Sequence, residues 1–395
     1  MTISIRGNFQ IHNFAQIIVV LQMGLSVKEV STAADYKNFV MFQFDLYQDN
    51  KFWVPPIIND EIKALQREYN PAFKFCASKY WLAYKGGKVV GRIGAIVNQL
   101  ALQKTGENVG RFTRSEFIDD NEVVDALFQV AEKWLVDQGM KSVQGPLGYT
   151  NLDHQGMMIE GHDHLPSAAS EYHLPYYKAQ LERLGYEKNI DWVEFRLFIK
   201  EVPEKAQRVS DMLMTRNKLR VGHYNSTSEL EPYAKQLFAL LNTAFDELFS
   251  VVPLNEEMVD YYIKRYMTLM NPKFVKLVFD ENDQLVAFII GLPSLSEALQ
   301  KAKGKIFPFG WWHLRKALKK PKVVDLMLTG ILPEYQGKGV AAILINELQK
   351  VMIEHGVTDV ETTGIFETNT KAIQNWKNYD HIQHKRKRCW SKSLV

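Results

Sequence analysis

Apolar and polar positions along the first half of the chain follow the spacing of alternating strands and helices. Segments with period-two alternation or β-branched runs indicate strands, and segments with period-3.6 spacing indicate helices. The expected elements are a strand at 27–30, helices to about 66, a hairpin turning at 85–88 with its second strand at 89–97, a strand at 111–119, a helix at 121–138, a strand at 141–147 and a helix at about 175–184.

The second half repeats this order of elements. They are expected at 219–225 (strand), 229–248 and 256–267 (helices), 274–293 (a hairpin turning at 281–283), 323–333 (strand), 340–355 (helix) and 357–366 (strand). Strands and helices in this mixed order predict an α/β or α+β fold, in which each half is a mixed, twisted sheet flanked by helices.

The length of 395 residues exceeds that of a usual single domain and predicts two domains. We place them at 24–202 and 203–395, following the repeated order of elements. Residues 1–23 contain only a short apolar run, at 17–21, and no small-residue cleavage site follows it. This segment is therefore expected to be a tail or a start-site artefact.

Composition narrows the class of protein. A net charge of +3 is too small to predict a nucleic-acid partner. The chain has only two cysteines, Cys76 and Cys389, which are too few for a disulfide framework and favour a reducing, cytoplasmic location. No apolar stretch approaches the roughly 20 residues that span a bilayer. The histidines of residues 162–164 fit a polar loop better than a metal site, so no metal is expected.

The most informative segment is ILPEYQGKGVAAILI at 331–345, where an apolar strand enters a glycine-rich turn and then a helix. Gly337 and Gly339 lack the Cβ atoms that would keep a ligand away from the main chain, so successive N–H groups can face an anion. The helix that follows adds its unpaired first-turn N–H groups and the positive end of its dipole. This junction predicts a pyrophosphate site.

Two common phosphate motifs do not match here. The dinucleotide fingerprint requires a third glycine where Ala342 stands, and the P-loop pattern is absent. The pattern Q/R-x-x-G-x-G/A is matched at Gln336, Gly339 and Ala341 after a Pro-Glu-Tyr lead-in. In this respect the segment resembles the acyl-CoA pyrophosphate loop of the GNAT superfamily of N-acetyltransferases.

The chain from about residue 24 resembles a bacterial family of two-domain GNAT proteins whose first domain is degenerate. The resemblance rests on segments such as VPPIINDEIKALQ, KSVQGPLGYTN and LTGILPEYQGKGVA. At the helix start of the first half, residues 119–122 read Asp-Asp-Asn-Glu, and these carboxylates would cap a helix and repel a pyrophosphate. The resemblance thus implies tandem GNAT-type acyl-CoA N-acyltransferase domains with the cofactor in the second.

The resemblance also implies how acetyl-CoA, the expected co-substrate, is held. The strand end would pair with the pantetheine amides, the loop would hold the pyrophosphate, and an asparagine after the next strand would reach the pantetheine arm. The corresponding residues are Ile331, Gln336, Gly337, Lys338, Gly339, Val340, Ala341 and Asn369.

The catalytic residues are less well defined. Many superfamily members place a general-acid tyrosine seven residues after the asparagine, where this chain has Trp376; Tyr379, one helical turn further, is the candidate replacement. Glu361 and Glu367 are the candidate bases, with Asp325 and Glu334 as further carboxylates. Solvated carboxylates at strand ends, or a water chain in place of a base, remain alternatives.

Two basic segments need an interpretation. The insertion at 294–322 combines four aromatic residues with many lysines, and we favour a lid packed against the neighbouring domain over a membrane-surface patch or an acidic-ligand site. The run at 384–388, His-Lys-Arg-Lys-Arg, is expected in a last strand as a solvated, basic edge.

The sequence therefore predicts a bacterial acyltransferase that moves an acetyl group from acetyl-CoA to an amine of a small molecule or peptide. The acceptor would bind between the domains, in a cleft shaped by the first domain and the insertion. Alternatives are a non-catalytic CoA-binding protein and an acyl or aminoacyl transferase that acts on a bulky acceptor. The oligomeric state stays open.

Overall fold

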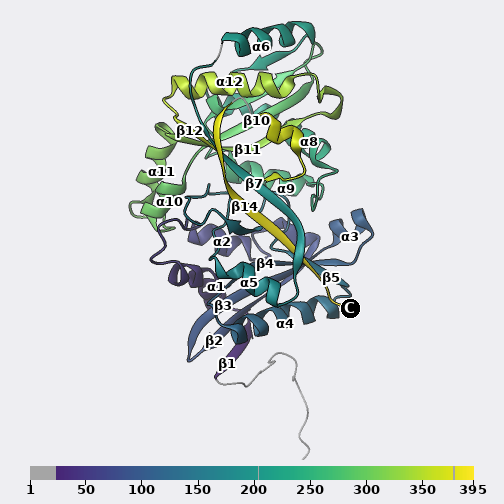
Figure 1. The fold of residues 1–395 in the computed structure, drawn as a ribbon, viewed down its shortest axis with the longest axis vertical. Coiled ribbons are helices and arrows are strands. Elements are labelled where there is room, and N and C mark those ends of the chain that lie inside the picture. The colour runs from purple at the N-terminus through teal and green to yellow at the C-terminus, as the bar shows by residue number, and fades with distance from the viewer. Residues whose placement is uncertain (1–23, 203, 377–378) are drawn as a thin grey trace, which may run out of the picture.

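A computed structural model describes residues 24–202, 204–376 and 379–395. The predicted tail at 1–23 lies outside the described residues. The molecule is elongated, with the first half of the chain below and the second half above in Figure 1, and two long strands cross between them. Among the described helices, none has the length and apolar character needed to cross a bilayer.

The first half contains the predicted alternation of strands and helices. Its elements are β1 (Leu25–Glu29), α1 (Ala33–Leu46), α2 (Ile58–Ala64), β2 (Cys76–Lys85), β3 (Lys88–Asn98), α3 (Gln99–Thr105), β4 (Val109–Phe117), α4 (Asn121–Asp137), β5 (Ser142–Gly145), β6 (Met157–Glu160), α5 (Tyr176–Arg183) and β7 (Glu187–Phe198).

The second half repeats the order of elements. They are α6 (Glu204–Arg216), β8 (Arg220–Gly222), α7 (Thr227–Leu230), α8 (Ala234–Phe245), α9 (Glu256–Tyr266), β9 (Val275–Phe279), β10 (Leu285–Pro293), α10 (Ser296–Ala302), α11 (Gly310–Lys319), β11 (Val323–Ile331), α12 (Val340–Glu354), β12 (Asp359–Thr362), β13 (Ile365–Phe366), α13 (Thr370–Gln374) and β14 (Asp380–Ser393). The mixed α/β fold expected from the sequence is confirmed.

Local chemistry explains several of these boundaries. Gly86 and Gly87 turn the β2–β3 hairpin with φ values of 58° and 77°, which residues with a Cβ rarely adopt. Asp120 caps the start of α4, where its side chain accepts a hydrogen bond from the Glu122 N–H. The other carboxylate oxygen of Asp120 lies 2.7 Å from Lys85 Nζ. The carboxylates at this helix start therefore serve the fold itself.

The two halves share one sheet because each gives a strand to the other. The described strands form a 14-stranded sheet in which β7 lies between β14 and β12, and β14 lies between β5 and β7. Thus β14, the last strand of the chain, pairs with β5 of the first half, while β7 pairs with β12 of the second half. Figure 1 shows β7 (teal) and β14 (yellow) running together through the middle of the molecule.

The exchange also completes two hydrophobic cores. Val193, Phe195 and Leu197 on β7 are buried in the core of the second half. Trp390 on β14 is buried in the core of the first half. Neither half can bury its own apolar residues fully without the strand that belongs to the other in chain order, so the halves are expected to unfold together.

The basic run at 384–388 is not a solvated edge, and that prediction was wrong. Lys385 and Lys387 are buried on an interior strand. Lys385 Nζ contacts Glu361 and lies 3.5 Å from Glu194 Oε2, while Lys387 Nζ lies 2.9 Å from Glu194 Oε1. His384 Nε2 lies 2.9 Å from Glu361 Oε1. We call these five residues the buried charge cluster.

Charge pairing keeps Glu194 of this cluster ionised in the interior. Burial raises the pKa of Glu194, but the neighbouring Lys387 and Lys385 outweigh it and hold that pKa at about 2. Ser170 Oγ also donates a hydrogen bond to Glu194 Oε1, at 2.6 Å. A buried charge that loses its partner is costly, so the cluster constrains how β7, β12 and β14 can align.

Replacing Lys385→Met should therefore destabilise the protein by about 3–5 kcal/mol, because Glu361 and Glu194 lose a buried partner. The matched control is Lys200→Met, which removes a lysine whose pair with Asp380, at 3.0 Å, is exposed. The control should cost about 1 kcal/mol or less. Urea unfolding measures both, and equal losses would contradict a buried role for the cluster.

Candidate functional site

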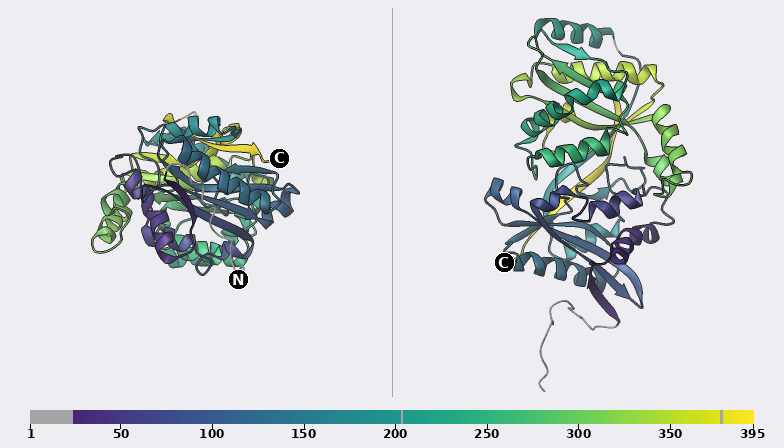
Figure 2. Two further views of the ribbon diagram at one scale, coloured as in Figure 1. Left: turned by 90° about the horizontal axis from the view of Figure 1, so that it is seen from below. Right: turned by 180° about the vertical axis from the view of Figure 1, so that it is seen from behind.

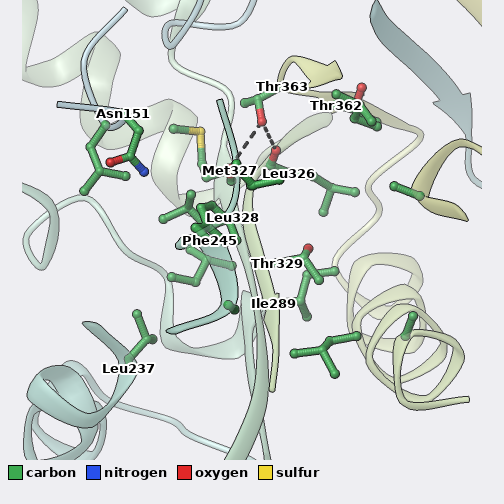
Figure 3. A pocket seen from close by; sticks show the side chains of 18 of the residues that line it. Asn151, Leu237, Phe245, Ile289, Leu326, Met327, Leu328, Thr329, Thr362 and Thr363 are labelled. Atoms are coloured by element: carbon green, nitrogen blue, oxygen red, sulfur yellow. Dashed lines mark hydrogen bonds between the residues drawn. The ribbon is translucent and has the colours of Figure 1, made fainter. Parts of the chain in front are cut away.

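Two parallel strands of the second half separate along their length. β11 and β12 pair only from Val323 to Leu326, opposite Asp359 to Thr362. After this point Thr363 stabilises the turn, because its Oγ1 donates to Leu326 O at 3.0 Å and to Met327 O at 3.2 Å (Figure 3). Its N–H also donates to Leu326 O, at 3.2 Å. Residues 328–331 of β11 have no strand partner on that side among the described residues.

A β-bulge on β11 accounts for the separation. Opposite β10, Ile290 pairs with Leu328 while the next residue, Gly291, pairs with Leu326, so Met327 is the extra residue. A bulge bends its strand and increases the local twist. The end of β11 therefore turns away from β12, while its pairing with β10 continues to Ile331.

A cavity of about 1050 Å³ opens at this separation. Strands β10 and β11 line it together with α8, α9 and the start of α12, as well as the segment after β12. Much of its wall is aliphatic or aromatic (Figure 3), including Leu237, Phe238, Phe245, Leu248, Phe249, Ile263, Tyr266, Met267 and Met270. The cavity is large enough for a ligand with an extended apolar chain.

The glycine-rich loop forms one end of this cavity. Gly339 has φ 81° and a Cβ there would lie 2.6 Å from Leu213, so only glycine fits. Among the described side chains, none caps α12. Within the described residues, the N–H groups of Gly337, Gly339, Val340 and Ala341 show no backbone acceptor outside the helix. These amides and the helix dipole suit an anion such as a pyrophosphate.

Most of the residues expected to hold the cofactor meet at this cavity. Its lining includes Ile331, Gln336, Gly337, Gly339, Val340, Ala341 and Asn369. Lys338 does not line it, and its ammonium instead lies over the Tyr335 ring, 5.0 Å from the centroid. The Asn369 side chain also caps α13 by accepting from the Ala372 N–H at 3.1 Å.

The predicted catalytic residues lie elsewhere. Tyr379 donates to Gln349 Oε1 at 3.2 Å, and burial raises the pKa of its phenol. Glu361 belongs to the buried charge cluster, and Glu367 lies 2.8 Å from Arg386 Nη1. None of the three lines the cavity. Trp376, at the position of the superfamily's general acid, does line it.

Asp325, another carboxylate considered from the sequence, is buried beside Glu361. The two residues are direct neighbours across β11 and β12. Burial and the negative charge of Glu361 raise the pKa of Asp325 to about 7. Its side chain lies on the strand face opposite Leu326, which lines the cavity, so Asp325 does not reach a ligand there.

The first half of the chain adds polar groups to the cavity wall. Asn151 and Asp153 both line the cavity. The Asn151 Oδ1 atom is buried and has no hydrogen-bond partner among the described residues. Asp153 Oδ2 accepts from the Thr150 N–H at 3.0 Å, and Thr150 Oγ1 lies 2.6 Å from Tyr262 OH of α9. These contacts join the segment to the second half.

Sequence reasoning did not assign a role to Asn151 or Asp153. The segment GPLGYTN at 145–151 belongs to the residues that show the family resemblance, and this was the available signal. The position of these side chains depends on the exchange of β7 and β14, which brings the first half against the cavity. Local periodicity contains no information on that contact.

The insertion at 294–322 is not a lid on this cavity, because none of its residues lines the cavity. It does pack against the neighbouring half, as expected. Gln300 Nε2 donates to Lys51 O at 2.8 Å, and Ser296 Oγ donates to Pro166 O at 2.7 Å. The insertion is thus held beside the first half through α10.

Sequence comparison agrees with this geometry. Residues 235–379 match the model of the acetyltransferase (GNAT) family. Protein YghO of Escherichia coli is 29% identical over 371 residues, covering 91% of this chain and 93% of YghO. A protein named bacterial ceramide synthase, from Caulobacter vibrioides, is 27% identical over 382 residues, covering 94% and 98% of the two chains.

Solved structures with the same fold include tandem proteins. A tandem GNAT protein from the clavulanic acid biosynthesis pathway superposes with a TM-score of 0.55 at 13% identity, over 94% of this chain and 99% of its own. A GCN5-related N-acetyltransferase from Sphaerobacter thermophilus gives 0.50 at 11% identity, over 95% and 97%. Residues 235–379 therefore form a domain of the acetyltransferase (GNAT) family, within a chain that has the tandem GNAT fold.

Proposed function

We propose that this protein transfers a fatty acyl group from a CoA thioester to the amine of a long-chain, lipid-like acceptor. One observation supports this most: a single large cavity reaches from the unpaired amides of the loop to an apolar chamber between β11, α8 and α9. The GNAT domain supports acyl transfer in general. The fatty chain and the lipid-like acceptor are our proposal.

The loop would hold the pyrophosphate of CoA through the amides of Gly337, Gly339, Val340 and Ala341. Its fit rests on those unpaired N–H groups and on the absence of a capping side chain at α12. The pantetheine arm would extend along residues 328–331 of β11, where the bulge leaves the strand edge without a partner among the described residues. Gln336 and Asn369 would border the arm.

In the proposed reaction the acceptor nitrogen attacks the thioester carbonyl, a C–N bond forms and the C–S bond breaks. The acceptor nitrogen must lose a proton, and the thiol of CoA, with a pKa near 8.5, leaves as thiolate or takes a proton. We assign Asp153 as the group that takes the acceptor's proton and Asn151 Oδ1 as an acceptor of its second N–H. Both line the cavity.

Glu361, Glu367 and Tyr379 would act indirectly in this proposal. Glu361 pairs with Lys385, and Lys385 shares Glu194 with Lys387. Lys387 in turn lines the cavity. Glu367 and Tyr379 are engaged with Arg386 and Gln349. We therefore regard these residues as positioning groups.

Chain length is the point on which we depart from the acetyl group expected from the sequence. The methyl of an acetyl group buries only a small apolar area, whereas this cavity of about 1050 Å³ is lined by many aliphatic and aromatic side chains. The relative named bacterial ceramide synthase is similar over nearly the whole chain. A ceramide is the amide of a fatty acid and a long-chain amino alcohol, so that name favours the same class of reaction.

Ala342→Glu tests the pyrophosphate site. Ala342 is exposed, lines the cavity and lies in the first turn of α12, where a glutamate suits the helix dipole and should leave folding intact. Its charge should weaken CoA binding at least about tenfold, since a like charge about 4 Å away costs on the order of 1–4 kcal/mol. Calorimetry with CoA measures this.

Ala342→Gln is the control for bulk, because it adds the same volume without the charge. It should bind CoA more tightly than Ala342→Glu. Equal binding by both variants and the wild type would place the pyrophosphate elsewhere.

Ala244→Phe tests the length of the acyl chain. Ala244 lies on α8 and lines the apolar chamber, so a phenyl ring there should obstruct a long chain and spare a short one. We expect the rate ratio of hexadecanoyl-CoA to acetyl-CoA to fall about tenfold or more, since overfilling an apolar site costs about 1–3 kcal/mol. Ala239→Phe, at an exposed position of the same helix, should leave the ratio unchanged. An unchanged ratio in Ala244→Phe would exclude the chamber as the chain site.

A further inference from the structure

The insertion between β10 and β11 concentrates the positive charge of the protein. Residues 294–322 contain eight lysines and arginines and one carboxylate, a net charge of +7, although the whole chain has only +3. The remainder of the chain is therefore net negative. Of the eight cations, only Lys301 has a carboxylate within salt-bridge distance among the described residues, at 3.3 Å. The others are available to an anionic partner.

The same segment exposes a cluster of aromatic side chains. Phe307 and Phe309 are 77% and 74% exposed, and Trp311 and Trp312 are 45% and 53% exposed. Four of the large hydrophobic residues that the described surface exposes thus fall within six positions. Together with the cations of α11 they form what we call the aromatic–basic patch, which consists of Phe307, Phe309, Trp311, Trp312, Arg315, Lys316 and Lys319.

Helix α11 presents both kinds of side chain to solvent on one face. Trp311, Trp312, Arg315, Lys316 and Lys319 recur at helical spacing and are exposed, whereas Leu314 and Leu318 are half-buried. The Lys316 ammonium lies 5.6 Å from the centroid of the Trp312 ring. The helix and its neighbour α10 project from the side of the molecule in all three views (Figures 1 and 2).

We propose that the aromatic–basic patch docks the protein on the surface of an anionic phospholipid bilayer. Tryptophan and phenylalanine are favoured at the boundary of headgroups and acyl chains, and lysine and arginine reach anionic headgroups from there. Exposed aromatics beside unpaired cations thus match both layers of such a surface. This inference rests on the proposed function, because a long-chain amine and its acylated product reside in membranes.

The aromatic–basic patch and the pyrophosphate loop lie at opposite ends of β11. The insertion is rooted where Ser294 N–H donates to Val323 O, at 2.9 Å, at the start of β11. The loop for pyrophosphate follows the other end of the strand, after Ile331. Nine residues of strand span about 27 Å at about 3.3 Å per residue. Docking would thus keep the pyrophosphate loop away from the bilayer, on the aqueous side. The apolar cavity residues Leu292 and Leu326 would lie nearer the bilayer, because they are next to the insertion.

Sedimentation with extruded vesicles tests the proposal, using phosphatidylcholine alone and phosphatidylcholine with phosphatidylglycerol. The wild type should bind the anionic vesicles much more tightly than the neutral ones. The variant Arg315→Gln/Lys316→Gln/Lys319→Gln should lose about 100-fold in affinity for anionic vesicles, at about fivefold for each charge. The variant Phe307→Ser/Phe309→Ser/Trp311→Ser/Trp312→Ser should lose the binding that persists at high salt.

The charge control is Lys37→Gln/Lys178→Gln/Lys205→Gln, which removes three exposed lysines from α1, α5 and α6. It should bind like the wild type, and thermal unfolding of each variant checks that folding is retained. No binding of the wild type to anionic vesicles would overturn the proposal, and a patch that serves an acidic protein or RNA would give that result. Equal losses in the patch and control variants would overturn it as well.

Failure of this proposal can be distinguished from failure of the proposed function. Vesicle binding needs neither thioester nor amine, so Ala342→Glu and Ala244→Phe should bind vesicles like the wild type. Conversely, the patch variants should retain their activity on substrates dispersed in detergent. Loss of that activity would mean that the patch serves the reaction itself and not membrane docking.

Discussion

The pairing of β7 with β14 is the interaction on which the rest of this structure depends. It extends from Phe198 opposite Asp380 to Glu187 opposite Ser391, and each strand also pairs with a sheet neighbour from the other half. One continuous sheet results, with Lys385 and Lys387 of β14 neutralised by Glu194 and Glu361 in its interior. The exchange also places Asn151 and Asp153 of the first half at the cavity of the second. The first half is thus a structural part of the cavity.

A second constraint operates within the GNAT domain. The bulge at Met327 adds one residue to β11 and turns the end of this strand away from β12. The two parallel strands therefore stop pairing after Leu326 and leave an opening between them. The opening joins two environments that suit the two ends of an acyl thioester. Unpaired amides lie at the loop, and an apolar chamber lies between β11, α8 and α9.

Features encoded locally could be predicted from the sequence. The hairpins at 85–88 and 281–283 and the strand and helix around Gly337 and Gly339 follow from glycine placement and periodicity. The residues expected to hold the cofactor came from that loop and from the family resemblance, and most of them line the cavity. The long-range features could not. A strand rich in lysine reads as an exposed edge, and only the strand order shows that Lys385 and Lys387 face carboxylates on β7 and β12. Asn151 and Asp153 were missed because the contact that places them at the cavity spans the two halves.

Formation of an amide from a fatty acyl thioester tests the central claim most directly. Purified protein would be supplied with hexadecanoyl-CoA and a long-chain amino alcohol, with release of free CoA thiol and the mass of the lipid product followed together. The account predicts one amide for each thiol released, and a rate at least about 100-fold lower in Asp153→Asn, the contribution expected of a general base. Wild-type protein that binds the thioester yet releases no thiol with any long-chain amine would contradict the account.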